Sequence, residues 1–305
     1  MPREPVPVPF GAPRPLSRRS FLRASAGAGL AVVGGSLLAG LDGGLPALAA
    51  EGKQTVAIPF SSDLYASPDP QRFSLVLQRG SADGIKFVSG PKVQVRFRPP
   101  GGAWQPYTAL RLDTEGLPKG RGVYRNDFTF GQEGIWKGQA KFSGATSSFR
   151  MQLPAAAVAP VPGMAAPRAA SPTTTDALGV NPICTAKPEC PLHTVSLADV
   201  VGSGKPVAAL FATPALCVSA YCGPVLDELL EVMGPYEDRV QFVHVDIYKS
   251  LTNSVLSPTV EAWKLPSEPW LYGIDGAGTI TGRLDTAFGK AEMVALLDGV
   301  VASPS

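Results

Sequence analysis

The stretch that decides the fold of the second half of the chain is residues 205–224, which read Lys-Pro-Val-Ala-Ala-Leu-Phe-Ala-Thr-Pro-Ala-Leu-Cys-Val-Ser-Ala-Tyr-Cys-Gly-Pro. Residues 207–212 are an apolar run, which predicts a buried strand. The strand leads directly into Cys217 and Cys222. The free backbone N–H groups and the dipole at a helix start favour the thiolate form of a cysteine. The stretch therefore predicts a reactive thiol presented at the end of a strand.

The elements around this stretch alternate regularly. A short helix is expected just after His193, before the strand at 207–212. After the cysteines we expect a helix at 223–233, a strand at 239–247, a helix at 257–264, strands at 269–274 and 279–284, and a final helix at 289–301. The last two strands are joined by a glycine-rich turn, Asp275-Gly-Ala-Gly278. The order predicts an α/β domain from 183 to 305.

This arrangement, together with Pro269 at the start of a late strand, resembles the exported thioredoxin-like proteins. The resemblance implies an α/β thioredoxin-like fold and thiol–disulfide exchange with protein thiols or disulfides through Cys217 and Cys222. It also implies a cis peptide bond at Pro269, with Trp270 beside it shaping the partner's groove. No cofactor is expected for such chemistry. Whether the pair would oxidise or reduce its partner stays open.

The sequence departs from that family at the cysteines themselves. Four residues separate Cys217 from Cys222, whereas the family has two. Five positions along an ideal helix climb about 7.5 Å, too far for a disulfide. The two can pair only if 217–222 is a loop and the helix begins near Pro224, a favoured first residue. We take Cys217 as the nucleophile and Cys222 as the resolving cysteine, although an alignment on Cys222-Gly-Pro reverses the roles.

A second difference concerns the acid that many thioredoxins bury beneath their cysteines. Its position corresponds to Leu210 here. Without that base, the resolving thiol would be harder to deprotonate, which indicates a slow reductant or a stable disulfide.

Another cysteine pair, Cys184 and Cys190, opens the α/β domain. With His193 it supplies only three metal ligands, fewer than a structural zinc site needs. As a disulfide it would close a short loop, which the chain-entropy model values at roughly 2 kcal/mol. We therefore predict a structural Cys184–Cys190 disulfide.

Two other functions remain open. In one, Cys217 and Cys222 bind copper together with His244 or His193, since thiolates with imidazole suit that metal. In the other, the Cys217–Cys222 bond is a permanent structural disulfide and the domain is a non-catalytic binding module. The reduction potential of the bond would separate exchange from structure.

The N-terminus predicts where the protein works. Residues 17–23 read Ser-Arg-Arg-Ser-Phe-Leu-Arg, a twin-arginine signature, and an apolar stretch follows as far as Leu41. Ala47-Leu-Ala49 is a small-residue cleavage site. Residues 1–49 are thus interpreted as a twin-arginine signal peptide, and the mature protein as extracytoplasmic: periplasmic, in the cell envelope or secreted. The apolar stretch is interrupted by glycines, so no stable transmembrane helix is expected after cleavage.

Residues 51–153 predict a separate all-β domain. Short runs with period-two alternation, at 56–58, 73–77, 93–97, 123–128 and 148–151, are separated by Gly, Pro and Asp clusters, as in a β-sandwich. A further strand, carrying Trp136, is expected to open at Gly131-Gln-Glu-Gly134. Its aromatic and glycine positions resemble small immunoglobulin-like envelope domains. Residues 154–182 are rich in Ala, Pro, Thr and Ser, which is typical of an extended, semi-rigid linker.

Charge divides between the two predicted domains. The whole chain carries +2, residues 51–153 carry +6 and residues 183–305 carry −7. No Lys/Arg run follows the signal, so a nucleic-acid partner is not expected. The opposite charges suggest that the two domains attract one another, or that each faces its own partner.

Overall fold

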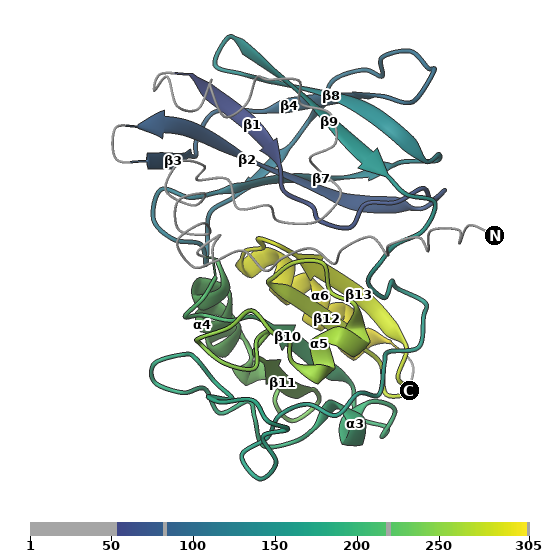
Figure 1. Ribbon diagram of the computed structural model, residues 1–305. Helices are drawn as coiled ribbons and strands as arrows, with labels where there is room; N and C mark the ends of the chain where they lie inside the picture. Colours follow the sequence, from purple (N-terminus) through teal and green to yellow (C-terminus); the bar gives the residue numbers. More distant parts are fainter. Residues whose placement is uncertain (1–53, 82–83, 218–220, 304–305) are drawn as a thin grey trace, which may run out of the picture. The chain divides into compact units, whose positions relative to one another are not determined.

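The computed structural model, shown in Figure 1, describes residues 54–81, 84–217 and 221–303. The twin-arginine signature and the cleavage site at 1–49 lie outside the described residues. Three sheets account for most of the regular structure. Two of them are built from residues 55–153, and the third from residues 207–285.

The two N-terminal sheets form a β-sandwich. One contains β1 (Thr55–Pro59), β2 (Pro70–Ser81), β7 (Val123–Thr129) and β6 (Arg111–Asp113) in that order, with β3 (Gly84–Val88) also paired to β2. The other has the order β5 (Thr108–Ala109), β4 (Gln94–Arg98), β8 (Gly134–Phe142) and β9 (Ala145–Leu153). Every strand pair in both sheets is antiparallel.

An aromatic core holds these two sheets together. Phe73 from β2, Phe97 from β4 and Trp136 from β8 are almost fully buried in one cluster. Phe73 and Phe97 meet edge to face with ring centroids 4.9 Å apart, a favoured arrangement for aromatic pairs. The alternation along β8 explains the arrangement, because every second side chain from Trp136 to Phe142 points inward. The predicted β-sandwich is confirmed.

The third sheet has the order β11-β10-β12-β13. Its strands are β10 (Val207–Phe211), β11 (Gln241–Val245), β12 (Trp270–Ile274) and β13 (Ile280–Asp285). β10 is parallel to β11 and antiparallel to β12, which is in turn antiparallel to β13. All five side chains of β10 are buried, as expected for a central strand covered on both faces.

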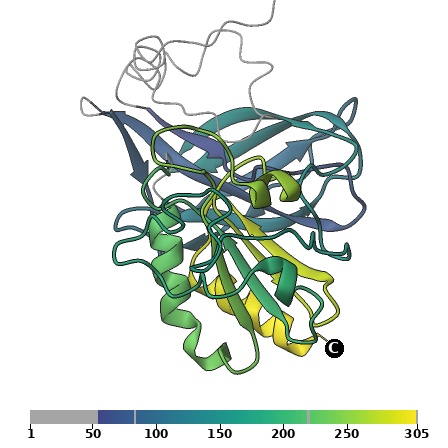
Figure 2. The same cartoon turned by 60° about the horizontal axis from the view of Figure 1, so that its bottom comes forward.

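Helices cover both faces of this sheet. α4 (Cys222–Val232) and α6 (Lys290–Ala302) share one apolar cluster with Leu210 and Leu271, whereas α5 (Pro258–Trp263) and α3 (Leu197–Val200) pack into the cluster on the opposite face. A 3-10 turn, η1 (Gly234–Tyr236), follows α4. Figure 2 shows α4 and α6 side by side against the strands.

The segment 154–182 packs against the third sheet, whereas we expected it to be a tether. Backbone hydrogen bonds join Gly163 to Ile280 over 2.8 Å and Ile280 to Met164 over 2.9 Å, and Ala165 forms a bridge with Thr279. Ala166 is buried in the same cluster as α5. The small side chains that gave the segment its linker composition allow this close approach to β13.

Ion pairs connect the sandwich with the C-terminal elements. Most of them join a basic residue of the N-terminal segment to an acidic residue of the C-terminal segment, as the opposite charges of the two segments suggested. Arg72 of β2 forms a hydrogen-bonded ion pair with Glu292 at 2.6 Å and a second ion pair with Asp285 at 3.2 Å. The pair of Arg283 and Asp63 has the opposite polarity: the basic residue Arg283 lies on β13 and its acidic partner, Asp63, lies in the N-terminal segment, at 2.8 Å. Arg125 of β7 also reaches Glu292, at 3.1 Å. Attraction between the two segments therefore has specific contacts.

Among the described residues, no helix combines the length and the apolar composition that crossing a membrane requires.

Candidate functional site

Cys217 and Cys222 form a disulfide, with their Cα atoms 5.9 Å apart. Cys222 is the first residue of α4 and is fully buried, whereas Cys217 lies in the preceding segment and is only partly buried. Pairing is possible because only Cys222 belongs to the helix, as the loop argument required, although the helix begins two residues earlier than Pro224. The sulfur that a partner can reach is therefore that of Cys217.

The start of α4 also differentiates the two sulfurs electrostatically. The backbone N–H of Cys222 donates a hydrogen bond to the Sγ of Cys217 over 3.3 Å. First-turn N–H groups carry the positive end of the helix dipole and stabilise a thiolate placed against them. After reduction, this donor favours negative charge on Cys217 rather than on Cys222.

Glu268 is the residue near these sulfurs that the sequence argument missed. A carboxylate oxygen of Glu268 and the sulfurs of Cys217 and Cys222 all lie within 4.8 Å of one another. Its Oε2 accepts a hydrogen bond from the backbone N–H of Thr213 over 2.8 Å. Burial raises the pKa of Glu268 to about 7, despite that hydrogen bond. The site therefore has an acid although Leu210 replaces the one expected on β10.

Pro269 and Trp270 are placed differently from one another. The Glu268–Pro269 peptide bond is cis, as expected. Trp270, by contrast, is only 1% exposed, and its ring stacks on Tyr272 in the cluster on the α5 face of the sheet. A groove wall must be exposed, so the expectation that Trp270 shapes a partner's groove is wrong. Alternation along β12 explains this, because Leu271 faces the α4 side and its neighbours face away.

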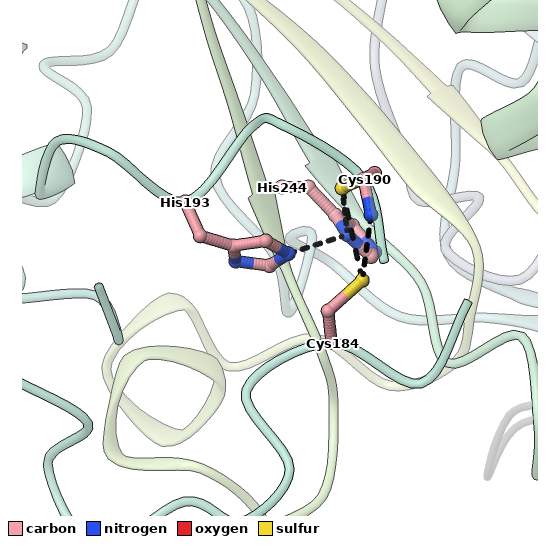
Figure 3. A group of neighbouring side chains, drawn as sticks. All are labelled: Cys184, Cys190, His193 and His244. Carbon is pink, nitrogen blue, oxygen red and sulfur yellow. Dashed lines mark hydrogen bonds between the residues drawn. The ribbon is translucent and has the colours of Figure 1, made fainter. Parts of the chain in front are cut away.

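The other two cysteines belong to a second, separate cluster. Cys184 and Cys190 are both free thiols, with their sulfurs 3.8 Å apart, so the predicted disulfide between them is absent. Nδ1 of His244 lies 3.3 Å from the Sγ of Cys190 and 3.2 Å from Nε2 of His193. All four side chains are buried, and Figure 3 shows the two rings and the two sulfurs converging on one point. At 3.8 Å the two sulfurs are well beyond the bond length of a disulfide, about 2.05 Å.

Hydrogen bonds define the protonation of this cluster. Nε2 of His244 lies 3.0 Å from the carbonyl oxygen of Ala212, which can only accept, so Nε2 carries the proton and Nδ1 presents a lone pair. Burial lowers the pKa of His244, which keeps the ring neutral. The sulfurs of Cys184 and Cys190 share a hydrogen bond over 3.8 Å, and this coupling lowers the pKa of Cys184 and raises that of Cys190.

The copper set of Cys217, Cys222 and His244 is not brought together. His244 lies on β11, and its two ring nitrogens face Cys190 and His193 on one side and Ala212 on the other. The ligand group containing Cys217 and Cys222 is completed by Glu268 instead. The prediction paired His244 with the wrong cysteines, because only the fold brings residues 184–193 beside β11.

Comparisons with known proteins give little further information. No family model and no curated protein matches the chain. Among solved structures, the Lin-41 filamin domain is similar at 14% identity with a TM-score of 0.22, over 33% of this chain and 92% of that one. A metagenome-derived glycoside hydrolase family 9 endoglucanase is similar at 24% identity with a TM-score of 0.20, over 32% of this chain and 18% of that one.

Proposed function

We propose that the chain is an extracytoplasmic protein that exchanges disulfides with the thiols or disulfides of protein partners through Cys217 and Cys222. In this proposal residues 183–305 have a thioredoxin-like fold and residues 51–153 are an immunoglobulin-like domain. The observation that carries the proposal is the disulfide itself, with one sulfur accessible at a helix start, the other buried, and a carboxyl group beside both. The element order and the cis bond at Pro269 support the fold assignment.

The exchange begins at Cys217. A partner thiolate attacks the Sγ of Cys217, forming a mixed disulfide and breaking the Cys217–Cys222 bond. The Cys222 sulfur leaves with the electron pair and takes a proton, which the protonated carboxyl of Glu268 can supply. A second partner thiolate then attacks the partner's own sulfur in the mixed disulfide and releases Cys217 as a thiolate, stabilised by the N–H of Cys222.

The same steps in reverse describe reduction of a partner disulfide. Cys217 attacks as the thiolate, and Glu268, now ionised, accepts the proton of Cys222 so that Cys222 can resolve the mixed disulfide. With a pKa of about 7, Glu268 is divided between its two forms near neutral pH and can serve in either direction.

The sandwich contributes to the surroundings of the buried cysteine. Tyr221, which precedes Cys222, packs edge to face against Phe60 and Phe87 of the N-terminal segment. The guanidinium of Arg121 lies 4.5 Å from the centre of the Phe87 ring. In the proposal, this cover keeps Cys222 inaccessible and leaves Cys217 as the point of attack.

A redox titration tests the proposal. The protein is equilibrated across a glutathione series, alkylated and analysed by mass spectrometry, with the peptides of Cys217 and Cys222 quantified separately from those of Cys184 and Cys190. We expect the Cys217–Cys222 bond to open between about −120 and −270 mV, the range of exchange proteins. A bond that stays closed below about −300 mV would instead favour the non-catalytic binding module with a structural disulfide.

A further inference from the structure

Two thiols and two imidazoles from distant parts of the sequence meet in one buried cluster, to which the exchange chemistry assigns no role. Cys184, Cys190 and His193 lie in one segment before α3, and His244 lies on β11. Two thiolates and two imidazoles are the ligand set of many structural zinc sites. We propose that Cys184, Cys190, His193 and His244 bind one Zn²⁺ ion as a closed, tetrahedral structural site.

The distances between the ligand atoms fit a tetrahedron. With Zn–S bonds of about 2.3 Å and Zn–N bonds of about 2.0–2.1 Å, the edges are about 3.8 Å between sulfurs, 3.5 Å between sulfur and nitrogen and 3.3 Å between nitrogens. The corresponding separations are 3.8 Å for Cys184–Cys190, 3.3 Å for Cys190–His244 and 3.2 Å for His193–His244. Three of the six edges therefore match a zinc tetrahedron to within about 0.2 Å, and the other three ligand pairs lie within 4.8 Å.

Outer hydrogen bonds orient two of the four ligands, His244 and Cys184. A metal-bound histidine usually donates its other ring N–H to a carbonyl or carboxylate, and Nε2 of His244 is positioned to do so with Ala212 at 3.0 Å. The backbone N–H of Cys190 donates to the Sγ of Cys184 over 3.4 Å, which stabilises a thiolate there. These contacts hold Nδ1 of His244 and the Sγ of Cys184 toward the centre of the cluster (Figure 3).

Charge selects a divalent ion. Two thiolates and two neutral imidazoles carry −2, so Zn²⁺ gives a neutral site, whereas Cu⁺ would leave a buried negative charge beside Asp246. One oxygen of Asp246 already lies 3.9 Å from Nε2 of His244, and the other is buried with no hydrogen-bond partner among the described residues. Binding is not a redox step: Zn²⁺ takes the place of the thiol protons, which are released to solvent.

The site would brace the segment that leads to the reactive cysteines. Thr185, next to Cys184, accepts a hydrogen bond from the backbone N–H of Ala215 over 3.3 Å and donates one to Asp246 over 3.2 Å. Since all four ligands are buried and none leaves a coordination position open, the ion has a structural rather than a catalytic function.

Cobalt titration tests the proposal. The full chain is reduced, stripped of metal with a chelator, and titrated with Co²⁺, whose visible absorption reports tetrahedral thiolate coordination. We expect one Co²⁺ per chain, displaced by Zn²⁺ and kept in Cys217→Ser/Cys222→Ser. Cys190→Ser and His244→Asn should each weaken binding by more than about 100-fold, the upper range for second-shell losses.

If those variants do not fold, the melting temperature of the unmodified chain still tests the proposal. For the unmodified chain, Zn²⁺ should raise the melting temperature and a chelator should lower it, because a ligand that binds the native state stabilises it. The proposal is overturned if Co²⁺ gives no tetrahedral spectrum, or if the spectrum is lost in Cys217→Ser/Cys222→Ser. It is also overturned if Cys184 and Cys190 form a disulfide in protein prepared with zinc.

Discussion

The carboxylate of Glu268 accepts a hydrogen bond from the backbone N–H of Thr213, over 2.8 Å, where β10 gives way to the segment that carries Cys217. This contact holds the carboxyl group of Glu268, which precedes β12, within 4.8 Å of the sulfurs of Cys217 and Cys222, which lie just before and at the start of α4. In the proposed exchange the acid therefore comes from the segment just before β12 (Trp270–Ile274), whereas the sequence argument looked for it on β10 at Leu210.

Replacing Glu268 by Gln should slow disulfide exchange. The amide keeps an acceptor for Thr213 but cannot transfer a proton to or from Cys222, and a general acid–base group contributes typically 10²–10⁴-fold to a rate. We expect at least a tenfold slower turnover of a dithiol or disulfide peptide at pH 7. Glu261→Gln, at an exposed position of α5, is the control. An unchanged rate in Glu268→Gln would remove Glu268 from the mechanism.

The same residue should make stability depend on pH. The pKa of Glu268 is raised to about 7 in the folded protein, from an ordinary value of about 4.3. The protonated group therefore supports the fold below about pH 4.3, and this contribution is lost as the pH rises to about 7. Denaturant unfolding measured across that pH range should show a larger fall in the free energy of unfolding for the parent chain than for Glu268→Gln. If the free energy of unfolding changed with pH equally in the two chains, the raised pKa of Glu268 would be contradicted.

The accessible cysteine can be identified by trapping. Without Cys222, a Cys217 thiolate that attacks a partner disulfide cannot be resolved, so Cys222→Ser should accumulate a covalent adduct. Cys217→Ser should not, because Cys222 is fully buried. Non-reducing electrophoresis with a model disulfide substrate measures both. Adducts in Cys217→Ser alone would reverse the two roles.

Gly138 on β8 should be intolerant of any side chain. A Cβ there would lie 2.0 Å from Cε2 of Phe149, whose ring is buried in the sandwich core. Overpacking of a core typically costs 1–3 kcal/mol, so Gly138→Ala should lower the free energy of unfolding by about 2 kcal/mol. Gly131→Ala, where a Cβ meets nothing within 4 Å, should change it by less than about 0.5 kcal/mol. Equal effects in chemical denaturation would contradict the packing argument.

Arg72 should stabilise the fold through its acidic partners. Removing one member of a buried ion pair leaves an unpaired charge and costs about 3–5 kcal/mol. Arg72→Met removes the ion pair of Asp285 and leaves Glu292 with Arg125 alone of its two arginine partners, and it should lower the melting temperature markedly. Arg79→Met, at an exposed position of the same strand, should change it little. A melting temperature for Arg72→Met equal to that of Arg79→Met would show that the network contributes no stability.

Most of the regular elements could be predicted from local pattern. The apolar run at 207–212 became β10 (Val207–Phe211), and the helix expected at 289–301 became α6 (Lys290–Ala302). Strands β3, β5 and β6 were missed, because β5 and β6 are only two and three residues long and no residue of β3 is fully buried. So short a run contains too little alternation to be distinguished from a loop.

The sequence alone determined the sandwich pattern, the position of the central buried strand and the placing of Cys217 and Cys222 at a helix start, because each depends on neighbours along the chain. Tertiary structure decided which ionisable groups meet. Glu268 reaches the disulfide through pairing of β10 with β12, and His244 reaches Cys184 and Cys190 because the backbone N–H of His244 on β11 donates to the carbonyl oxygen of Leu192 over 3.0 Å. Contacts between residues some fifty positions apart follow from strand order and register, which no local periodicity encodes.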